Sequence, residues 1–415
     1  MNLLAFLREN ARWLALGGLL LFFGAVGQTY FIAMSVGDLR RELGWSHGAF
    51  SALYMAATLT SAFALPHLGG LLDRHPPRRV VAWVVAGLAL FAALLAWSTH
   101  WAAVLLALVG LRLFGQGLMP QTAFHVLGRW FAAERGRAMS LATLGFNGGQ
   151  ALLPAAFVAL AAVIGWRHTW LAVALLLLLA VWPLLTWLAG QERQPRAADV
   201  AAARRAAPDR TRAQALRTPL FWLALLGVLP PAFIAGLVFF HQAHLAEVRG
   251  WSLQTMAASL SVLAVVTVLS SLVAGPRIDR SSAAQWLPLY LLPLGAGCLV
   301  LGLVPQAWAV PVFMVLYGLT DGISLTLMGA LWPELFGVRH VGAIRSVVVA
   351  VLVTASAAGP GLGGVLIDAG VPFPAVIAAM SGLCVAVSLV MPLAVRSARA
   401  QQASCRGSAA GPPQG

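Results

Sequence analysis

The sequence predicts an all-α membrane protein whose twelve transmembrane helices form two pseudo-symmetric six-helix bundles. Three observations support this prediction: long apolar runs between short polar breaks, an uneven distribution of arginine, and a repeat of 206 residues. Only 10% of the 415 residues are charged, and the mean hydropathy is +0.84. Because a soluble chain carries about 25% charged residues, this chain has too little polar surface to cover a water-soluble globule.

The apolar runs define the expected spans, because a helix needs about 20 apolar residues to cross a bilayer. Glycine and proline inside the runs are compatible with membrane helices, where neighbouring helices satisfy the freed backbone groups. The first run is too long for a signal peptide, so we expect it to be an uncleaved span. The expected spans are 12–36, 48–72, 79–98, 102–128, 136–164, 168–189, 218–246, 253–275, 283–304, 307–334, 340–368 and 372–395.

The distribution of arginine predicts the orientation. All 27 residues of the Lys and Arg class are arginine, and 22 of them fall in termini, loops or span ends on one side of the predicted topology. The opposite side holds only Arg40, Arg41, Arg167 and Arg249. The positive-inside rule therefore places both termini in the cytoplasm, in a multi-pass protein of the inner (plasma) membrane. The net charge of +14 then faces anionic membrane lipid, and no nucleic-acid partner is needed to explain it.

A constant spacing between matching motifs indicates that the two halves of the chain are an internal repeat. Each of three features recurs 206 residues later, and 206 residues is about half of the chain. The pairs are Gly44–Ser46 with Gly250–Ser252, Asp73–Arg74 with Asp279–Arg280, and Pro154 with Pro360. Since six is an even number, both halves enter the membrane from the same face, as in transporters with parallel repeats.

The repeat also sets the expected domains. We predict an N-terminal six-helix bundle over 1–189 and a C-terminal six-helix bundle over 218–395. The arginine- and alanine-rich segment 190–217 is expected to be a cytoplasmic linker. The tail 396–415 is rich in glycine, proline, alanine and glutamine, and we expect it to be disordered.

Charged loops in both halves carry a family resemblance. The pattern Gly69-x-Leu71-x-Asp73-Arg74 lies between the second and third predicted spans, within "GGLLDRHPPRR". A less complete version of it, "GPRIDRSS", follows the eighth predicted span. The pattern resembles the signature of the major facilitator superfamily, although Pro76 stands where that signature has glycine. The resemblance implies that fold, secondary transport by rocker-switch alternating access, and a central cavity lined by the first, fourth, seventh and tenth spans.

The same motifs supply the residues that we expect to control gating. Glycine lets two helices pack closely, and paired charges at helix ends lose their partners when the helices part. Two glycine-rich stretches at matching positions, "GFNGGQALLP" and "GPGLGG", add bending and close contact. A purely topogenic role for the charges is the alternative. The predicted gating residues are Gly69, Asp73, Arg74, Arg78, Asp279, Arg280, Pro154 and Pro360.

A narrower resemblance points to a substrate class. "GWS" after the first span and "RWFAAERGRAMSLATLGFNGG" over 129–149 resemble the monocarboxylate and oxalate/formate branch of the superfamily. The resemblance implies a small organic anion as substrate, often moved in symport with a proton. The charged ligands of that branch in the first, eighth and eleventh spans are missing here. Gln150 stands where an antiporter signature has proline, which disfavours drug/proton antiport.

Two charges fall in the middle of predicted spans, where a charge costs at least about 2.5–3.5 kcal/mol. They are Arg112 in the fourth span and Asp321 in the tenth. Our hypothesis is that Arg112 binds a carboxylate substrate, whereas Asp321 carries the coupling proton or pairs with Arg112 when the site is empty. The alternative for Arg112 is a structural role in holding helices together.

Polar residues in the spans complete the expected site. The further substrate-binding candidates are Gln28, Tyr30, Gln116, Asn147, Gln150 and His241. The three cysteines indicate neither a disulfide framework nor a metal site, and we expect no cofactor. A chain without lysine has no phosphate-binding Walker loop, and no nucleophile–base pair stands out, so we expect a monomeric transporter and not an enzyme. Proton-driven efflux of amphipathic compounds and a non-transporting membrane sensor are the alternatives.

Overall fold

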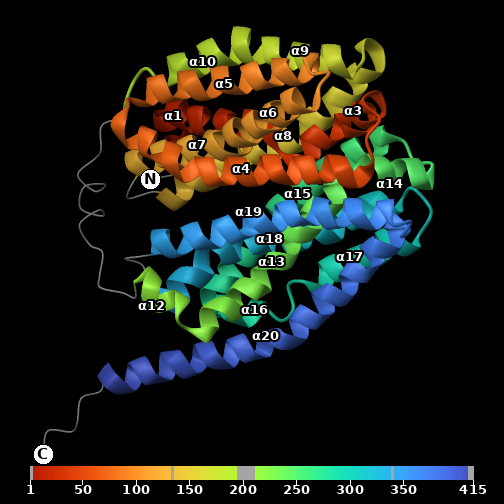
Figure 1. Cartoon of the computed structure of the whole chain (residues 1–415). Coiled ribbons are helices and arrows are strands. Elements are labelled where there is room, and N and C mark those ends of the chain that lie inside the picture. The colour runs from red at the N-terminus through yellow and green to blue at the C-terminus, as the bar shows by residue number, and fades with distance from the viewer. Residues whose placement is uncertain (1–2, 132–134, 194–210, 338–340, 410–415) are drawn as a thin grey trace, which may run out of the picture. The chain divides into compact units, whose positions relative to one another are not determined.

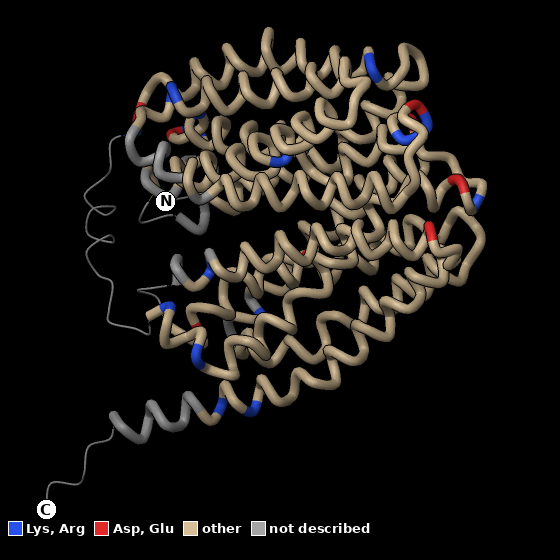
Figure 2. The backbone as a smooth tube through the Cα atoms, viewed as in Figure 1, with Lys and Arg blue, Asp and Glu red and all other residues tan. Residues whose placement is uncertain are grey.

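The computed structural model describes residues 3–131, 135–193, 211–337 and 341–409, and regular structure in these ranges is helical (Figure 1). Eleven helices within the described ranges are long and apolar enough to cross a membrane. The predicted fold class, an all-helical membrane protein, is confirmed. Charged positions lie mostly near helix ends, as the bilayer interior requires (Figure 2).

The helices of the N-terminal half include two 3₁₀ turns, η1 and η2, and two π-helical segments, η3 and η4. In order they are α1 (Leu3–Gly24), η1 (Ala25–Gly27), α2 (Thr29–Ile32), η2 (Ala33–Ser35), α3 (Val36–Leu43), α4 (His47–Arg74), α5 (Pro77–Trp97), α6 (Trp101–Leu111), η3 (Arg112–Leu118), α7 (Met119–Trp130), α8 (Arg135–Ile164), α9 (Trp166–Leu176), η4 (Leu177–Val181) and α10 (Trp182–Leu188).

The C-terminal half begins with a short helix capped by Thr211, whose hydroxyl accepts a hydrogen bond from the backbone of Gln214. Its helices are α12 (Arg212–Leu216), α13 (Pro219–Phe240), α14 (Gln242–Arg249), α15 (Leu253–Arg280), α16 (Ala283–Trp286), α17 (Leu292–Leu303), α18 (Ala309–Phe336), α19 (Val341–Asp368) and α20 (Phe373–Ala409). The last helix continues beyond the expected end of the final span at residue 395.

The predicted ninth span, 283–304, is interrupted. Short α16 is followed by turns, and the apolar helix α17 has only 12 residues. Pro288 and Pro293 explain the difference, because proline lacks the N–H that continues a helix and clashes with the preceding turn. Pro293 stands in the first turn of α17, where its missing N–H costs nothing.

Matching local structure accompanies the sequence repeat. Gly44 ends α3 and Gly250 ends α14, with φ of 67° and 68°, a left-handed conformation that favours glycine. Helices α4 and α15 both have 28 residues, and their ends lie 206 positions apart, 47 to 253 and 74 to 280. The repeated letters therefore mark equivalent turns and helices.

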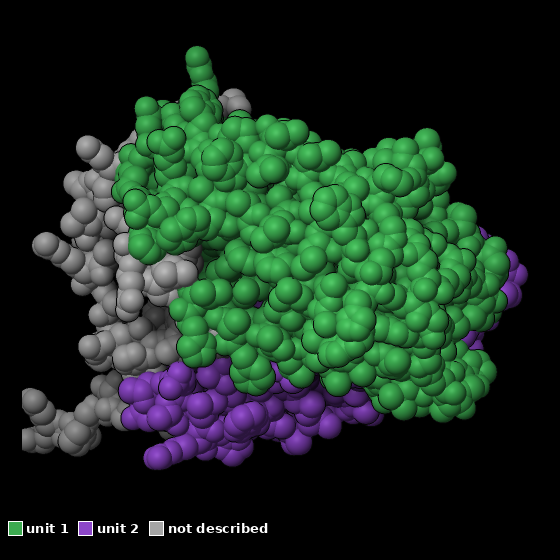
Figure 3. All heavy atoms as spheres, turned by 45° about the horizontal axis from the view of Figure 1, so that its top comes forward, with its two compact units in different colours: residues 1–206, 235–264, 356–373 green, residues 207–234, 265–355, 374–415 purple. Residues whose placement is uncertain are grey.

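The chain forms two compact units that do not coincide with its sequence halves (Figure 3). Unit 1 contains residues 1–206, 235–264 and 356–373, and unit 2 contains 207–234, 265–355 and 374–415. In unit 1, α1 packs on α7 and α8, and α5 packs on α6 and α9; in unit 2, α17 packs on α18. Unit 1 thus joins the N-terminal half to one end of α13, α15 and α19.

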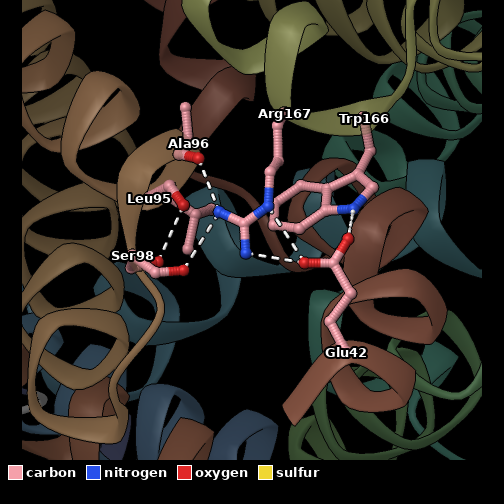
Figure 4. Close-up of polar contacts among 6 residues, drawn as sticks. All are labelled: Glu42, Leu95, Ala96, Ser98, Trp166 and Arg167. Carbon is pink, nitrogen blue, oxygen red and sulfur yellow. Dashed lines mark hydrogen bonds and ion pairs between the residues drawn. The ribbon is translucent and has the colours of Figure 1, made fainter.

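A polar clamp holds three segments of unit 1 together (Figure 4). The Arg167 guanidinium donates to Oε2 of Glu42 from Nε at 2.9 Å and from Nη2 at 2.6 Å, and Nη1 donates to the carbonyls of Ala96 and Ser98. The Trp166 indole donates to Oε1 of Glu42 at 2.7 Å. The clamp connects the end of α3 to the end of α5 and the start of α9.

The clamp lowers the pKa of the Glu42 carboxyl. Partial burial opposes its ionisation, but the hydrogen bonds from Trp166 and Arg167 and the charge of Arg167 outweigh burial, so the pKa of Glu42 lies below its usual 4.5. A carboxyl with a lowered pKa stabilises the fold above its unfolded-state pKa. The contribution of Glu42 to the free energy of unfolding is lost as the pH falls through the pKa of the carboxyl in the folded state.

We expect Glu42→Gln to lower the free energy of unfolding at pH 7 by about 1 kcal/mol, the upper end of the range for a surface ion pair, since the Glu42 side chain is 42% exposed. The measurement is thermal or denaturant unfolding in detergent. The matched control is Asp38→Asn, which removes a carboxylate from the exposed Asp38–Arg41 pair on the same helix. The difference between wild type and Glu42→Gln should shrink below pH 4. An equal loss in the control, or a difference that grows in acid, would contradict the assignment.

Candidate functional site

The first predicted span is broken at its centre. Helix α1 gives way to η1 at Ala25, Gln28 is extended with φ of −80° and ψ of 152°, and α2 restarts at Thr29. Gly27 makes the break compatible with tight packing, since a Cβ there would lie 2.2 Å from the Leu111 carbonyl oxygen. Discontinuous helices that expose backbone groups at mid-membrane commonly form transporter binding sites.

The facing segment of the fourth span is also irregular. It changes from α-helix to π-helix at Arg112 and returns to α-helix at Met119. Gly115 lies in this π-helical turn, and a Cβ on it would be 2.6 Å from the Cα and N of Gly27. π-Helical turns are rare and frequently occur at functional sites. Two irregular segments thus meet at backbone contact beside the mid-membrane arginine.

Arg112 is buried at this junction, with 1% of its surface exposed. Its Nη1 donates to the Thr29 hydroxyl at 3.0 Å and to the Gly27 carbonyl at 3.4 Å. The Tyr54 hydroxyl donates to the same Thr29 oxygen at 2.9 Å, and its ring centre lies 5.3 Å from the guanidinium carbon. These neutral groups orient the guanidinium from α2, η1 and α4.

The remaining donors of Arg112 have no partner among the described residues. Its Nε and Nη2 are buried and make no hydrogen bond with the described residues, and no carboxylate in the described ranges forms an ion pair with it. An unsatisfied buried donor costs about 1–3 kcal/mol, and more when it is charged. A guanidinium presents its donors in a planar fork that fits a carboxylate. The arrangement is chemically suited to receive an anion.

Two predicted residues belong to the irregular segments that meet beside Arg112. Gln28 is the extended residue of the break and is half-buried. Gln116, also half-buried, follows Gly115 in the π-helical segment, and its backbone nitrogen lies beside Gly27. These two amides come from the same two irregular segments that hold the guanidinium.

Other predicted residues surround η1 or lie beyond it. Tyr30 is buried with an unpaired hydroxyl, and its carbonyl accepts from the Gln242 amide at 3.0 Å. Asn147 and Gln150 are buried on α8, which packs against α1 where Gly149 meets the Phe22 carbonyl. Asn147 donates to the Thr143 carbonyl, and its side-chain oxygen is unpaired.

His241 belongs to a separate histidine cluster in unit 1. Its Nε2 lies 3.0 Å from the Pro360 carbonyl oxygen, and the His47 ring lies 6.0 Å from it and 4.2 Å from the His244 ring. The ring of Phe240 links this cluster to Tyr54, at a centroid distance of 4.5 Å. The structure therefore places His241 away from the immediate partners of Arg112.

The predicted gating segment around Pro360 packs at backbone distance. A Cβ on Gly363 would lie 2.8 Å from the His241 ring, and one on Gly364 would lie 2.8 Å from the His47 carbonyl oxygen. Nearby, the Asp368 carboxylate accepts from the Ser46 hydroxyl at 2.6 Å and the Gly48 amide at 2.8 Å. These contacts bind the end of α19 to the start of α4. Pro154, the repeat partner of Pro360, is buried within α8.

The charged loop motifs are only partly described. Gly69, Asp73 and Arg74 end α4, and Asp279 and Arg280 end α15, but their side chains lie outside the described set. Arg78 is described and is exposed in the first turn of α5. The predicted charge latch stays a prediction.

Asp321 lies within α18 of unit 2 and is half-buried. Its Oδ2 accepts a hydrogen bond from the Thr267 hydroxyl of α15 at 3.2 Å. No ion pair involving Asp321 occurs within the described ranges. Because Arg112 belongs to unit 1, the expected pairing of the two charges stays a prediction.

The sequence did not single out Thr29, Tyr54 or His47. Thr29 and Tyr54 are neutral residues in apolar spans, so no charge marked them; the only signal for Thr29 was its position next to Gln28. His47 directly follows "GWS" and carries no further sequence signal. Neutral groups that orient a charge become visible only when the helices are packed.

Comparison with known proteins identifies the class of protein. A family model described as Major Facilitator Superfamily matches residues 14–280 and 238–412. The chain belongs to the major facilitator superfamily, a family of membrane transporters. Membership agrees with the predictions of the superfamily and of a protein that is not an enzyme.

Two curated relatives are similar to parts of the chain. A probable L-galactonate transporter of Escherichia coli (strain K12) is 31% identical over 162 residues, covering 38% of this chain and 36% of the relative. Human monocarboxylate transporter 11 is 31% identical over 273 residues, covering 61% of this chain and 55% of the relative. The chain thus spans between about a third and about half of the length of these relatives.

Solved structures support the fold. A bacterial homologue of the human lysosomal transporter Spinster, in an inward-facing and occupied conformation, has a TM-score of 0.65 with 17% identity, covering 93% of this chain and 95% of that one. Its inward-facing, unoccupied form has a TM-score of 0.64 with 16% identity and the same coverage.

The packing of the break generates a prediction. Gly27→Ala should lower the free energy of unfolding by about 1–3 kcal/mol, because the new methyl group would overlap backbone atoms of Leu111 and Gly115. The measurement is folded yield and unfolding in detergent. Gly18→Ala on α1 is the matched control, since its Cβ would meet nothing within 4 Å. Equal stability of the two variants would show that the break is not held by this contact.

Proposed function

We propose that the protein is a secondary active transporter of a small organic anion, a monocarboxylate-like acid, by alternating access. The observation that carries the proposal is the buried guanidinium of Arg112 beside a broken helix, because its Nε and Nη2 make no hydrogen bond with the described residues. A carboxylate supplies the missing acceptors, and in a water-poor site such charge-assisted bonds are strong. Neutral substrates would leave the buried charge without compensation.

The relatives favour the same substrate class. The names of both relatives, a probable L-galactonate transporter and a monocarboxylate transporter, refer to carboxylates. Each match covers only part of the chain, so the substrate class rests on Arg112 and its free donors together with these names. Gln28 and Gln116 would contribute neutral hydrogen bonds to the same ligand.

The distribution of arginine supports a cytoplasmic location for both termini, in an inner or plasma membrane. In that orientation the turns at Gly44 and Gly250 face outward. The contacts of His241 with Pro360, and of Asp368 with Ser46, would then close the outer side of the pathway. Opening this side requires these contacts to break, as a rocking motion demands.

We further propose that Asp321 carries the coupling proton. A carboxyl in the middle of a span is costly when ionised, and the hydrogen bond that Asp321 accepts among the described residues comes from the neutral Thr267 hydroxyl. Such a group exchanges protons when the local charge or water content changes. Its protonation would let the empty or loaded carrier change its conformation.

Replacing Arg112 tests the substrate site. Arg112→Gln in proteoliposomes should lower kcat/KM for labelled monocarboxylates roughly 30- to 150-fold, since a hydrogen bond to a charged group contributes about 2–3 kcal/mol. The kcat/KM of Arg112→Lys should lie between the values of wild type and Arg112→Gln, because lysine keeps the charge but lacks the planar fork of donors. Arg277→Gln, an exposed arginine on α15, is the control and should transport normally.

A second readout separates binding from a structural role. Excess monocarboxylate should raise the unfolding temperature of wild type and leave that of Arg112→Gln unchanged. If the variant is strongly destabilised while retaining the ligand-dependent rise, Arg112 is structural. If a panel of organic acids gives neither uptake nor stabilisation in wild type, the proposed substrate class is wrong, and efflux or sensing remains.

Replacing Asp321 tests coupling. Asp321→Asn should abolish uptake driven by a pH gradient and keep exchange of labelled for unlabelled substrate, which needs no net proton movement. Thr267→Val is the matched control, because it removes the hydrogen bond at 3.2 Å and keeps the carboxyl. Gradient-driven uptake by Asp321→Asn at the wild-type rate would rule out the assigned role.

A further inference from the structure

A large basic groove lies in unit 1, apart from the site around Arg112. It has a volume of about 810 Å³, and its lining includes three arginines and no acidic residue. Its charged and aromatic lining consists of Arg12, Arg78, Arg79, Trp182 and Trp187. They come from α1, the first turn of α5 and α10.

The groove opens at the level of the membrane surface. Pro77 is the first residue of one candidate span, and Leu188 is the last residue of another, so both span ends border the groove. Trp182 and Trp187 expose 38% and 62% of their surface. Exposed tryptophans at span ends typically lie among lipid headgroups. A ligand in this groove would therefore sit at headgroup depth.

One of the arginines is fixed in place. Arg12 donates from Nε to the Leu188 carbonyl at 2.9 Å and from Nη1 to the Gln191 side chain at 2.9 Å. Its guanidinium carbon lies 4.6 Å from the centre of the Trp187 ring. Arg12 forms no ion pair with the described residues, so its positive charge lines one wall of the groove.

The other two arginines are free to bind a ligand. Arg78 and Arg79 are exposed, and neither makes a hydrogen bond or ion pair with the described part of the chain. They follow Pro76 and Pro77 in the first turn of α5, where the helix dipole adds further positive potential. Two free guanidinium groups and one fixed guanidinium face a common space.

We propose that this groove binds the phosphate headgroup of an anionic phospholipid. A phosphodiester matches the forked donors of arginine, and the exposed tryptophans supply the amphipathic border that a lipid needs. Basic pockets between membrane helices are suited to anionic headgroups. A free phosphate ion offers the same charge but makes no use of the groove's position at the bilayer surface.

The test measures lipid binding to the full chain in detergent by native mass spectrometry. The probes are phosphatidylglycerol, phosphatidylcholine and inorganic phosphate. Wild type should retain phosphatidylglycerol in preference to phosphatidylcholine. Arg78→Gln/Arg79→Gln should weaken phosphatidylglycerol binding by about 10- to 30-fold, given about 1 kcal/mol per arginine near a membrane surface.

The matched control is Arg396→Gln/Arg399→Gln, which removes two exposed charges from α20 and should change binding by less than twofold. Arg78→Lys/Arg79→Lys should keep most of the affinity. Single substitutions of Arg78 and Arg79 provide the same comparison should the double variant fold poorly.

Three outcomes would overturn the proposal. If the α20 control weakened phosphatidylglycerol binding as much as Arg78→Gln/Arg79→Gln, the lipid would be held by general attraction to positive charge and not by the groove. Equal retention of phosphatidylcholine would show that the headgroup charge is not recognised. Complete displacement of phosphatidylglycerol by an equal concentration of inorganic phosphate would show a site for soluble phosphate.

Discussion

The burial of the Arg112 guanidinium, which forms no ion pair with the described residues, is the constraint on which the membrane core of unit 1 depends. A charge at the centre of a bilayer costs several kcal/mol, and a carboxylate would neutralise it most simply. Here Arg112 is held by a carbonyl, a hydroxyl and an aromatic ring, so the positive charge remains available. Both helix irregularities serve this arrangement. The break at Gln28 frees the Gly27 carbonyl, and the π-helical turn brings the guanidinium to it.

The helical fold and the repeat could be predicted because they depend on features that can be seen in the sequence without knowing how the helices pack. Apolar length marks spans, arginine marks one side of the membrane, and a 206-residue offset marks the second half. The matched turns at Gly44 and Gly250 show how local this information is: each needs only a glycine with positive φ. Arg112 and Asp321 were likewise visible, because a charge inside a long apolar run is conspicuous.

The features that could not be predicted depend on packing. The first span was expected to be continuous, but its break is possible only because Gly27 meets Gly115 from another helix. Thr29 and Tyr54 orient Arg112 without any charge of their own. The interrupted ninth span differs, because Pro288 and Pro293 are visible in the sequence and together break the helix.

The geometry at Gln28 has a mechanical consequence. The first span is two rods joined by one extended residue, so bending there changes few dihedral angles and disturbs neither rod. The Nη1 of Arg112 donates to Gly27 at the end of one rod and to Thr29 at the start of the other. The guanidinium is therefore a strap across the joint. Any swing that separates the rods must release at least one of these bonds, so the angle of the joint and the orientation of the charge change together.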